Sequence, residues 1–234
     1  MEKNAGAAGI FAKNNARKRC AGVAGMLQLS CTQKPASHDR QNGSKCCHGK
    51  GDFGMKVAMI GHKDFPSRSG GVEVMVGGLA ASLVRRGYEV TVYNRGLQKG
   101  HNVYTTEGVQ ARRIFTFQKA SLNAMVYSFL ATFDALTRDC DVIHYHAIGP
   151  SVPLVIAKLF GKHTVCTVHG LNWKVDKWGG FASAYLRLGE RVAAKYADDL
   201  VVLSESEWNY FQEKYDRTAI LIPNAVQMRQ PLPC

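Results

Sequence analysis

The sequence predicts an α/β fold, a single Rossmann-like, doubly wound parallel sheet over residues 55–226. Short, almost continuously apolar runs recur from Met55 onward, as is typical of strands buried on both faces. Single segments with helical spacing separate these runs. Strands joined through single helices are parallel and connected by right-handed crossovers, which gives an open sheet of about seven strands.

The first strand and helix carry the clearest pattern. The run "MKVAMI" at 55–60 is apolar and ends at a glycine, which indicates a buried strand. Arg85 and Arg86 suit the carboxyl end of the following helix, and Gly87 suits a left-handed cap. One face of that helix is apolar, through Val72, Met75, Val76, Leu79, Leu83 and Val84.

The same alternation predicts the remaining elements. Ser204 and Glu207 form a capping box, which fixes the start of the last helix. Further strands are expected at 88–94, 109–117, 141–146, 163–169, 199–204 and 219–223, because each is a short apolar run. Helices are expected at 121–137, 150–161, 180–196 and 205–215, where apolar residues recur at helical spacing.

Two adjacent glycines interrupt the first helix. Gly77 and Gly78 each cost about 1 kcal/mol relative to alanine in a helix interior. We interpret them as sites of close packing between helix and sheet. Space for a ligand is the alternative interpretation.

Residues 1–54 are expected to be a disordered basic extension. They hold nine Lys and Arg against three Asp and Glu, with no helical or strand periodicity. Such a segment buries too little apolar area to offset its ordering entropy. A zinc site lacks paired ligand spacing here, and a signal peptide would have a short apolar core interrupted by Gln28.

The loop after the first strand does not match a dinucleotide or P-loop fingerprint. Gly61 follows the strand, but the next glycines are Gly70 and Gly71, so the G-x-G-x-x-G spacing fails. Two glycines at a helix start expose backbone N–H groups, which makes a generic anion site. A tight entry turn explains them equally well.

Five segments in the same order resemble Family 4 glycosyltransferases. They are "MKVAMIGHKDFPSRSGGVEVMVGGLAASLVRRGYEVTVYNR", "DVIHYHAIGP", "TVHGLNWKVDKW", "ERVAAKYADDLVVLSESEWNYF" and "LIPNAV". Together they span roughly residues 55–226 and are most similar to bacterial, rhamnosyltransferase-like enzymes of surface polysaccharide synthesis. The resemblance implies the N-terminal, acceptor-side half of a GT-B fold, in which a second domain holds the nucleotide sugar.

The resemblance also implies an activity. A hexosyl or deoxyhexosyl group would pass from a nucleotide sugar to a saccharide or lipid-linked acceptor, with retention and without a metal. The nucleotide sugar is then a substrate, and no cofactor is expected. Residues 227–234 are expected to be a truncated tail, which leaves catalysis by this chain open. A non-catalytic module that binds an acceptor or a partner is the alternative function.

Residues at the carboxyl ends of strands are the candidates for the site. His169 follows a strand and precedes Gly170, and the resemblance gives it a functional role as the catalytic candidate. His144 and His146 share one face of their strand. We expect His144 to be structural and His146 to bind the acceptor.

The other candidates lie on neighbouring loops. The resemblance gives Gly70 and Gly71 the donor-phosphate role, and Arg68 adds a cation to the same loop. Asn94 ends the second strand and is an acceptor-binding candidate. Trp173 is the aromatic candidate for stacking on a sugar, with membrane anchoring or core packing as alternatives.

Charge and cysteines limit the partners and the compartment. The formal net charge is +12, but half of it falls in residues 1–54 and no nucleic-acid module is present, so nucleic acid is not an expected partner. Cys140 and Cys166 are expected to be buried thiols, which favours the reducing cytoplasm. A lipid-linked acceptor would add peripheral association with the inner face of the membrane.

Overall fold

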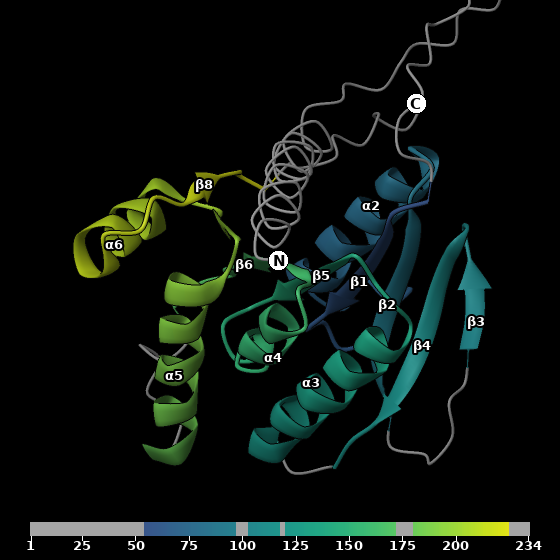
Figure 1. Cartoon of the computed structure of the whole chain (residues 1–234), viewed down its shortest axis with the longest axis horizontal. Helices are drawn as coiled ribbons and strands as arrows, with labels where there is room; N and C mark the ends of the chain where they lie inside the picture. Colours follow the sequence, from purple (N-terminus) through teal and green to yellow (C-terminus); the bar gives the residue numbers. More distant parts are fainter. Residues whose placement is uncertain (1–53, 97–102, 118–119, 172–179, 225–234) are drawn as a thin grey trace, which may run out of the picture.

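The computed structural model describes residues 54–96, 103–117, 120–171 and 180–224, which form a mixed α/β domain around one sheet (Figure 1). The sheet has the order β3-β4-β2-β1-β5-β6-β7-β8. Its strands are β1 (Lys56–Ile60), β2 (Glu89–Gly96), β3 (Val103–Thr106), β4 (Val109–Phe115), β5 (Val142–His146), β6 (His163–Thr167), β7 (Asp199–Val202) and β8 (Ile220–Leu221).

The sheet is parallel apart from one edge strand that the sequence analysis missed. Strand β3 pairs antiparallel with β4, and Thr106 lies opposite Val109. The connecting residues Glu107 and Gly108 have φ values of 53° and 78°. Two left-handed residues in succession make the tight turn that matches the twist of a hairpin. The polar segment "VYTTEG" thus forms a hairpin arm rather than a loop.

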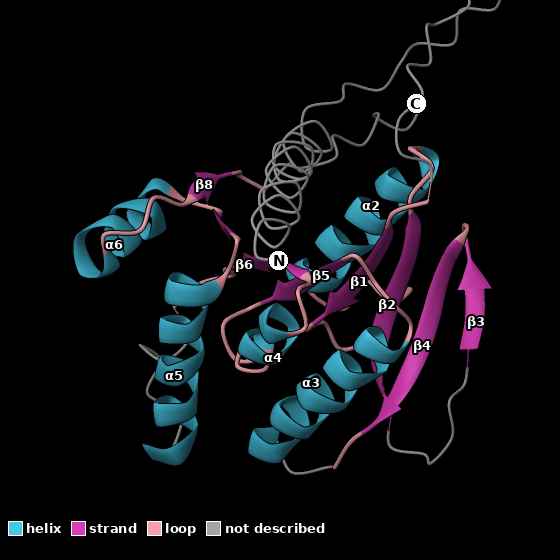
Figure 2. Cartoon of the chain, viewed as in Figure 1, coloured by secondary structure: helices cyan, strands magenta, loops and turns pink. Residues whose placement is uncertain are grey.

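Helices cover both faces, which confirms the doubly wound arrangement. Helix α2 (Gly71–Arg85) packs on one face, through Val76, Ala80 and Leu83. Helices α3 (Ala120–Thr137), α4 (Leu154–Leu159), α5 (Gly180–Tyr196) and α6 (Glu205–Tyr215) contribute to the core of the other face. Figure 2 shows α3, α4 and α5 in front of the strands and α2 behind them.

Element ends follow local capping chemistry. Helices α5 and α6 have the predicted bounds, and the Ser204 hydroxyl accepts the Glu207 amide at 3.3 Å. Gly87 has a φ of 88°, and the amides of Gly87 and Tyr88 close a Schellman motif on α2. The prediction of a helix over 150–161 was too long, because turns occupy the residues before Leu154. Strand β6 ends at Thr167, so His169 lies beyond it.

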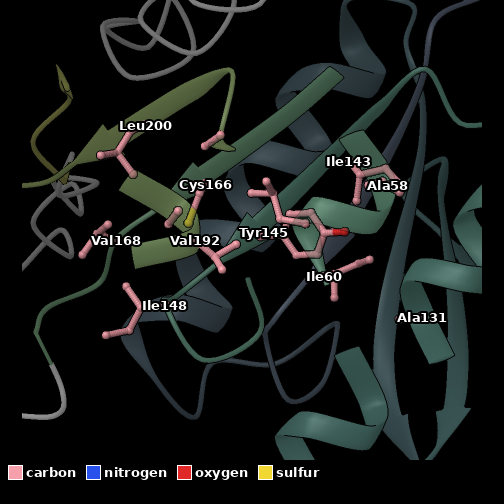
Figure 3. Packing of buried hydrophobic residues seen from close by; sticks show 14 of the residues in the cluster. Ala58, Ile60, Ala131, Ile143, Tyr145, Ile148, Cys166, Val168, Val192 and Leu200 are labelled. Atoms are coloured by element: carbon pink, nitrogen blue, oxygen red, sulfur yellow. The ribbon is translucent and has the colours of Figure 1, made fainter. Parts of the chain in front are cut away.

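Alternating strand residues divide the buried side chains between two cores. Ala58, Ile60, Ile143, Tyr145 and Cys166 point toward the face that α3–α6 cover (Figure 3). Val57, Met59 and Val92 belong to the core beneath α2. This alternation is what buries both faces of the strands and makes their sequences almost continuously apolar.

Several expectations concern residues outside the described part of the chain. The proposed extension at 1–54, apart from Gly54, and the tail at 227–234 lie there, as does Trp173. Cys140 and Cys166 are buried, free thiols, as expected. Among the described residues, no helix combines the length and apolarity needed to cross a bilayer.

The packing interpretation of Gly77 and Gly78 was wrong. A Cβ at Gly77 would meet the Phe65 ring at 3.6 Å, an ordinary contact, and one at Gly78 would have nothing within 4 Å. A close approach occurs instead at Gly189 of α5, where a Cβ would lie 1.9 Å from the Ile148 carbonyl oxygen. Gly189 is therefore the helical glycine that packing requires.

Replacement of Gly78 by alanine should stabilise the protein. The residue is exposed in a helix interior, so the change restores helix propensity without a clash and should raise the free energy of unfolding by about 1 kcal/mol. Urea unfolding of Gly78→Ala measures this. Gly189→Ala is the matched control and should lower stability, and equal effects of the two changes would contradict the assignment.

Candidate functional site

The candidate site lies at the point where the strand order of the sheet reverses. Strand β1 pairs with β2 on one side and with β5 on the other. The chain therefore first adds strands on the β2 side of β1 and later adds strands on the β5 side. Ligands in open α/β sheets bind outside the carboxyl ends of strands at such a switch point. Residues 61–70, between β1 and α2, and the residues that end β5 and follow β6 meet there.

Gly61 allows this meeting. Its φ is +129°, and a Cβ at this position would lie 2.1 Å from the His146 carbonyl oxygen. Any side chain at residue 61 would therefore collide with the backbone of β5, and the conformation itself favours glycine. This close approach brings residues 61–70 against the end of β5.

Two side chains, buried Tyr127 and partly buried Arg95, tether the start of this loop. The Gly61 N–H donates to the Tyr127 hydroxyl oxygen at 3.2 Å, and Arg95 Nη2 donates to the Gly61 carbonyl at 3.1 Å. The Arg95 guanidinium lies 5.1 Å from the centre of the Tyr127 ring. The backbone N–H of Arg95 also donates to the Lys63 carbonyl at 2.9 Å. Together these contacts fix the loop relative to β2 and α3.

Asn94 is fully buried and holds the same loop. Its Oδ1 lies 2.9 Å from His62 Nε2, and its Nδ2 donates to the Phe65 carbonyl at 2.8 Å and to the Tyr104 hydroxyl at 2.7 Å. The Tyr104 hydroxyl donates to the same Phe65 carbonyl. Both polar ends of Asn94 therefore have protein partners, and its acceptor-binding role finds no support in this geometry.

Gly70 and Gly71 start α2 with an open first turn. Gly70 is the N-cap in extended conformation and provides no side-chain cap. A Cβ at Gly70 would lie 2.4 Å from Glu73 Oε2, whereas one at Gly71 would have nothing within 4 Å. Backbone N–H groups at an uncapped helix start can receive an anion, and Arg68 lies exposed on the adjoining loop.

Glu73 is a buried carboxylate in this first turn that the sequence analysis missed. Its Oε1 accepts the Lys63 N–H at 3.2 Å, so it joins the start of the loop to the start of α2. The signal was present, because a Glu three residues after an N-cap reaches back toward the preceding chain. With glycine as the cap, this Glu receives a loop amide instead of the N-cap amide.

Three histidines stand in a row across β5 and the segment after β6. The rings of His144 and His146 are 4.1 Å apart between centroids, and those of His146 and His169 are 5.7 Å apart. His169 Nε2 lies 3.5 Å from His146 Nδ1, and His144 Nε2 lies 2.8 Å from Thr167 Oγ1. The structural role expected for His144 agrees with this last contact.

The histidines differ in accessibility. His144 and His146 are buried, whereas His169 is partly exposed. His146 Nε2 is buried without a hydrogen-bond partner among the described residues. His146 thus has no free surface for a large acceptor in this structure, and among the described residues its side chain has a hydrogen-bond contact with His169. His62, which directly follows Gly61, is a fourth member that strand-end reasoning could have found.

Burial keeps this histidine cluster, His62, His144, His146 and His169, in the neutral form. It lowers the pKa of His62 to about 4, against an opposing contribution from the hydrogen bond with Asn94. Burial lowers the pKa of His144 to about 3 and that of His169 to about 4, and Glu73 partly opposes the latter. Burial and the neighbouring rings hold the pKa of His146 well below its usual value.

Neutral imidazoles both donate and accept hydrogen bonds, which suits contact with sugar hydroxyls. In the described ranges, no group of three or more His, Cys, Asp or Glu side chains is arranged to hold a metal ion. The site therefore combines a helix N-terminus without a side-chain cap, the Glu73 carboxylate of its first turn, a loop cation and one partly exposed neutral histidine. These groups can bind a phosphate and contact a hydroxyl beside it.

Loss of Asn94 should loosen the loop. Asn94→Ala removes one of the two donors to the Phe65 carbonyl and leaves His62 Nε2 without its partner, and an unsatisfied buried group costs about 1–3 kcal/mol. The free energy of unfolding should fall, and amide hydrogen exchange at residues 61–66 should accelerate. Asn209→Ala, at an exposed position, is the control and should change neither measurement. If amide hydrogen exchange at residues 61–66 is unchanged in Asn94→Ala, Asn94 does not hold the loop in place.

Acid should destabilise the fold through the histidine cluster. The folded-state pKa of His62 and of His169 is about 4, below the value of 6.5 expected in the unfolded chain. The unfolded state therefore binds more protons below pH 6.5, and stability present above that pH is lost as the pH falls toward 4. Each such histidine contributes up to about 1.4 kcal/mol per pH unit in that window.

Urea unfolding at pH 7.5, 6.5 and 5.5 checks this expectation before most carboxylates titrate. The variant His144→Gln removes one titrating ring, whose pKa is lowered to about 3, and should flatten the decline between pH 6.5 and 5.5. Stability that stays constant from pH 7.5 to 5.5 in the unaltered chain would show that the cluster is not held neutral by burial.

Comparisons with known proteins agree with this architecture. The sequence model of Glycosyltransferase Family 4 matches residues 69–230. The structure is similar to sucrose-phosphate synthase from Thermosynechococcus elongatus, with a TM-score of 0.58, 17% identity, and coverage of 72% of this chain and 48% of that one. The chain therefore spans about half the length of that relative.

A shorter chain of sucrose-phosphate synthase from the same organism gives a TM-score of 0.51 at 13% identity, covering 74% of this chain and 90% of that one. The curated proteins include no significant match. The likeness to these structures confirms a Rossmann-like half of a GT-B fold. Because the family match covers more than half of the sequence, the chain belongs to Glycosyltransferase Family 4.

Proposed function

We propose that this domain is the acceptor-side half of a glycosyltransferase that transfers a hexosyl or deoxyhexosyl group from a nucleotide sugar to a saccharide or lipid-linked acceptor. Family membership supports the reaction class. The observation that carries the proposal is the N-terminus of α2, which has no side-chain cap and lies at the switch point of the sheet, with Glu73 of its first turn near enough to His169 to act on its pKa. An anion site next to a neutral hydrogen-bonding group suits a sugar diphosphate.

In this proposal the start of α2 receives the donor phosphate. The N–H groups after Gly70 and the helix dipole stabilise negative charge on the diphosphate leaving group. The open space at Gly71 lets an anion approach the backbone closely. Arg68 adds an exposed positive charge from the loop, and Glu73 holds the loop against the helix.

His169 is proposed to contact a hydroxyl of the donor sugar or of the acceptor, because it is the accessible ring of the histidine cluster. The geometry supports a positioning role for His146, whose Nδ1 faces His169 Nε2 at 3.5 Å. Asn94 is likewise proposed to position the loop rather than to touch the acceptor. Trp173, outside the described residues, stays an acceptor-binding candidate by resemblance.

The finer features of the activity remain predictions from the resemblance. They are a rhamnosyltransferase-like donor preference, retention without a metal, a role in bacterial surface polysaccharide synthesis, and a cytoplasmic location at the inner face of the membrane. The alternative function is a non-catalytic module that binds an acceptor or a partner. It differs from the main proposal in needing no nucleotide site.

Titration with uridine, guanosine and thymidine diphosphates tests the phosphate site. Gly71→Ala should keep the fold, because nothing lies within 4 Å of the added methyl group. It should weaken diphosphate binding about tenfold, equivalent to about 1.4 kcal/mol, by blocking the backbone amides. Gly78→Ala is the matched control on the same helix and should leave binding unchanged.

Calorimetry measures these affinities, and incubation with radiolabelled nucleotide sugars measures transfer or hydrolysis. Diphosphate binding that weakens about tenfold in Gly71→Ala but not in Gly78→Ala supports the proposal. Saccharide binding with no nucleotide binding would favour the non-catalytic alternative. If no diphosphate binds to the unaltered chain, the assignment of the α2 N-terminus is wrong.

A further inference from the structure

A second concave surface lies at the carboxyl edge of the sheet, beside His169 in the chain but on different elements. It is a groove of about 390 Å³ lined by Leu171, Ser206, Glu207, Asn209, Tyr210 and Glu213. Leu171 follows His169 by two residues, and Ser206 lies in the first turn of α6, just after β7. The groove therefore opens at the sheet edge where ligands of this fold bind.

One face of α6 makes most of the lining. Positions 206, 209, 210 and 213 recur at helical spacing and so lie on one side of the helix. The capping box fixes the start of that helix, because Glu207 Oε2 accepts the Leu203 N–H at 3.0 Å. The Tyr210 hydroxyl donates to the buried Glu190 carboxylate of α5 at 2.7 Å. These contacts hold two of the lining residues in place without a ligand.

The remaining polar groups are free to bind. Asn209 and Glu213 are exposed, and neither side chain makes a hydrogen bond within the described part of the chain. A carboxylate accepts hydrogen bonds, and an amide both donates and accepts them. Partly buried Leu171 and Tyr210 add apolar surface beside these groups. Hydroxyl groups next to an apolar C–H face have the complementary chemistry, which is that of a pyranose ring.

Charge separates this groove from the phosphate site. Glu207 and Glu213 line it, and no Lys or Arg is among its lining residues. The loop after β1 instead carries exposed Lys63 and Arg68. Strands β1 and β7 are three positions apart in the sheet, about 14 Å at the usual spacing of strands. That loop also carries exposed Asp64, so its cations and carboxylates are mixed, whereas the groove on α6 is lined by carboxylates without a cation.

We propose that the groove on α6 is a subsite for an uncharged sugar unit of the acceptor. This inference rests on the proposed glycosyltransferase function and deepens it. The acidic lining repels phosphate and uronic acid groups, so the donor diphosphate is directed to α2 and a neutral sugar to α6. His169 follows β6, which lies between β1 and β7 in the strand order, and there the acceptor hydroxyl would meet the donor sugar.

Chemical-shift mapping with simple sugars tests the subsite on the full chain. The probes are methyl α-rhamnoside, methyl α-glucoside and N-acetylglucosamine, with glucuronate as the acidic counterpart. The neutral sugars should shift the amides of Leu171 and of residues 206–213. Glucuronate should bind at least about threefold more weakly, as expected for repulsion between like charges at an exposed site.

Two variants test the lining residues. Asn209→Ala and Glu213→Gln should each weaken binding of the neutral sugars, and Glu213→Gln by about tenfold, the effect of losing a hydrogen bond to a charged group. Glu205→Gln changes an exposed carboxylate on the same helix outside the groove, and it is the control that should bind normally. Equal affinities in all three variants would overturn the proposal.

A uridine diphosphate titration of the same sample separates this inference from the proposed function. Shifts at residues 61–71 with diphosphate, together with no shift at 206–213 with any sugar, would refute the subsite alone. Preferential binding of glucuronate over the neutral sugars would also refute it. Failure of the diphosphate and of every sugar would refute the proposed function as well.

Discussion

The close approach of two backbones at the switch point is the constraint on which the site depends. Residue 61 passes so near the His146 carbonyl oxygen that a Cβ would lie 2.1 Å from it. This contact lets the loop after β1 lie over the end of β5 instead of turning outward. Tyr127, Arg95 and Asn94 then hold the loop from three sides, and α2 begins at the position that the loop determines.

The same approach explains the unusual chemistry beneath the loop. Imidazole rings at His62, His144 and His146 are buried where an apolar core would ordinarily continue. They remain neutral because burial disfavours the charged form more than their hydrogen bonds favour it. Because these rings are neutral, they can pack closely together. The partly exposed His169 therefore has a histidine neighbour rather than a counter-ion.

The charged residues at the carboxyl edge of the sheet differ between the start of α2 and the groove on α6. The loop before α2 carries exposed Lys63 and Arg68 together with exposed Asp64, whereas carboxylates without a cation line the groove on α6. The strand order separates these regions, with β5 and β6 and their histidines between them. In the proposed function, this difference in charge would direct a charged donor and an uncharged acceptor sugar to different parts of the edge.

Local pattern alone determined the alternation of strands and helices. Apolar runs and capping residues fixed the bounds of α5 and α6, because periodicity and caps act within a few residues. The choice of His169 came from its place after a strand and from the family resemblance, and that of Gly70 and Gly71 came from their place at a helix start and from the same resemblance. Each of these inferences needed only neighbours in the sequence.

Only the tertiary structure decided the features that depend on residues far apart in the sequence. The sequence could not tell that Asn94 would be buried by a loop thirty residues away, or that His146 would face His169 instead of solvent. The antiparallel edge strand was equally hidden, because "VYTT" is polar and gains its role only by pairing with β4. Burial and pairing depend on which strands become neighbours, and that information is spread over the whole chain.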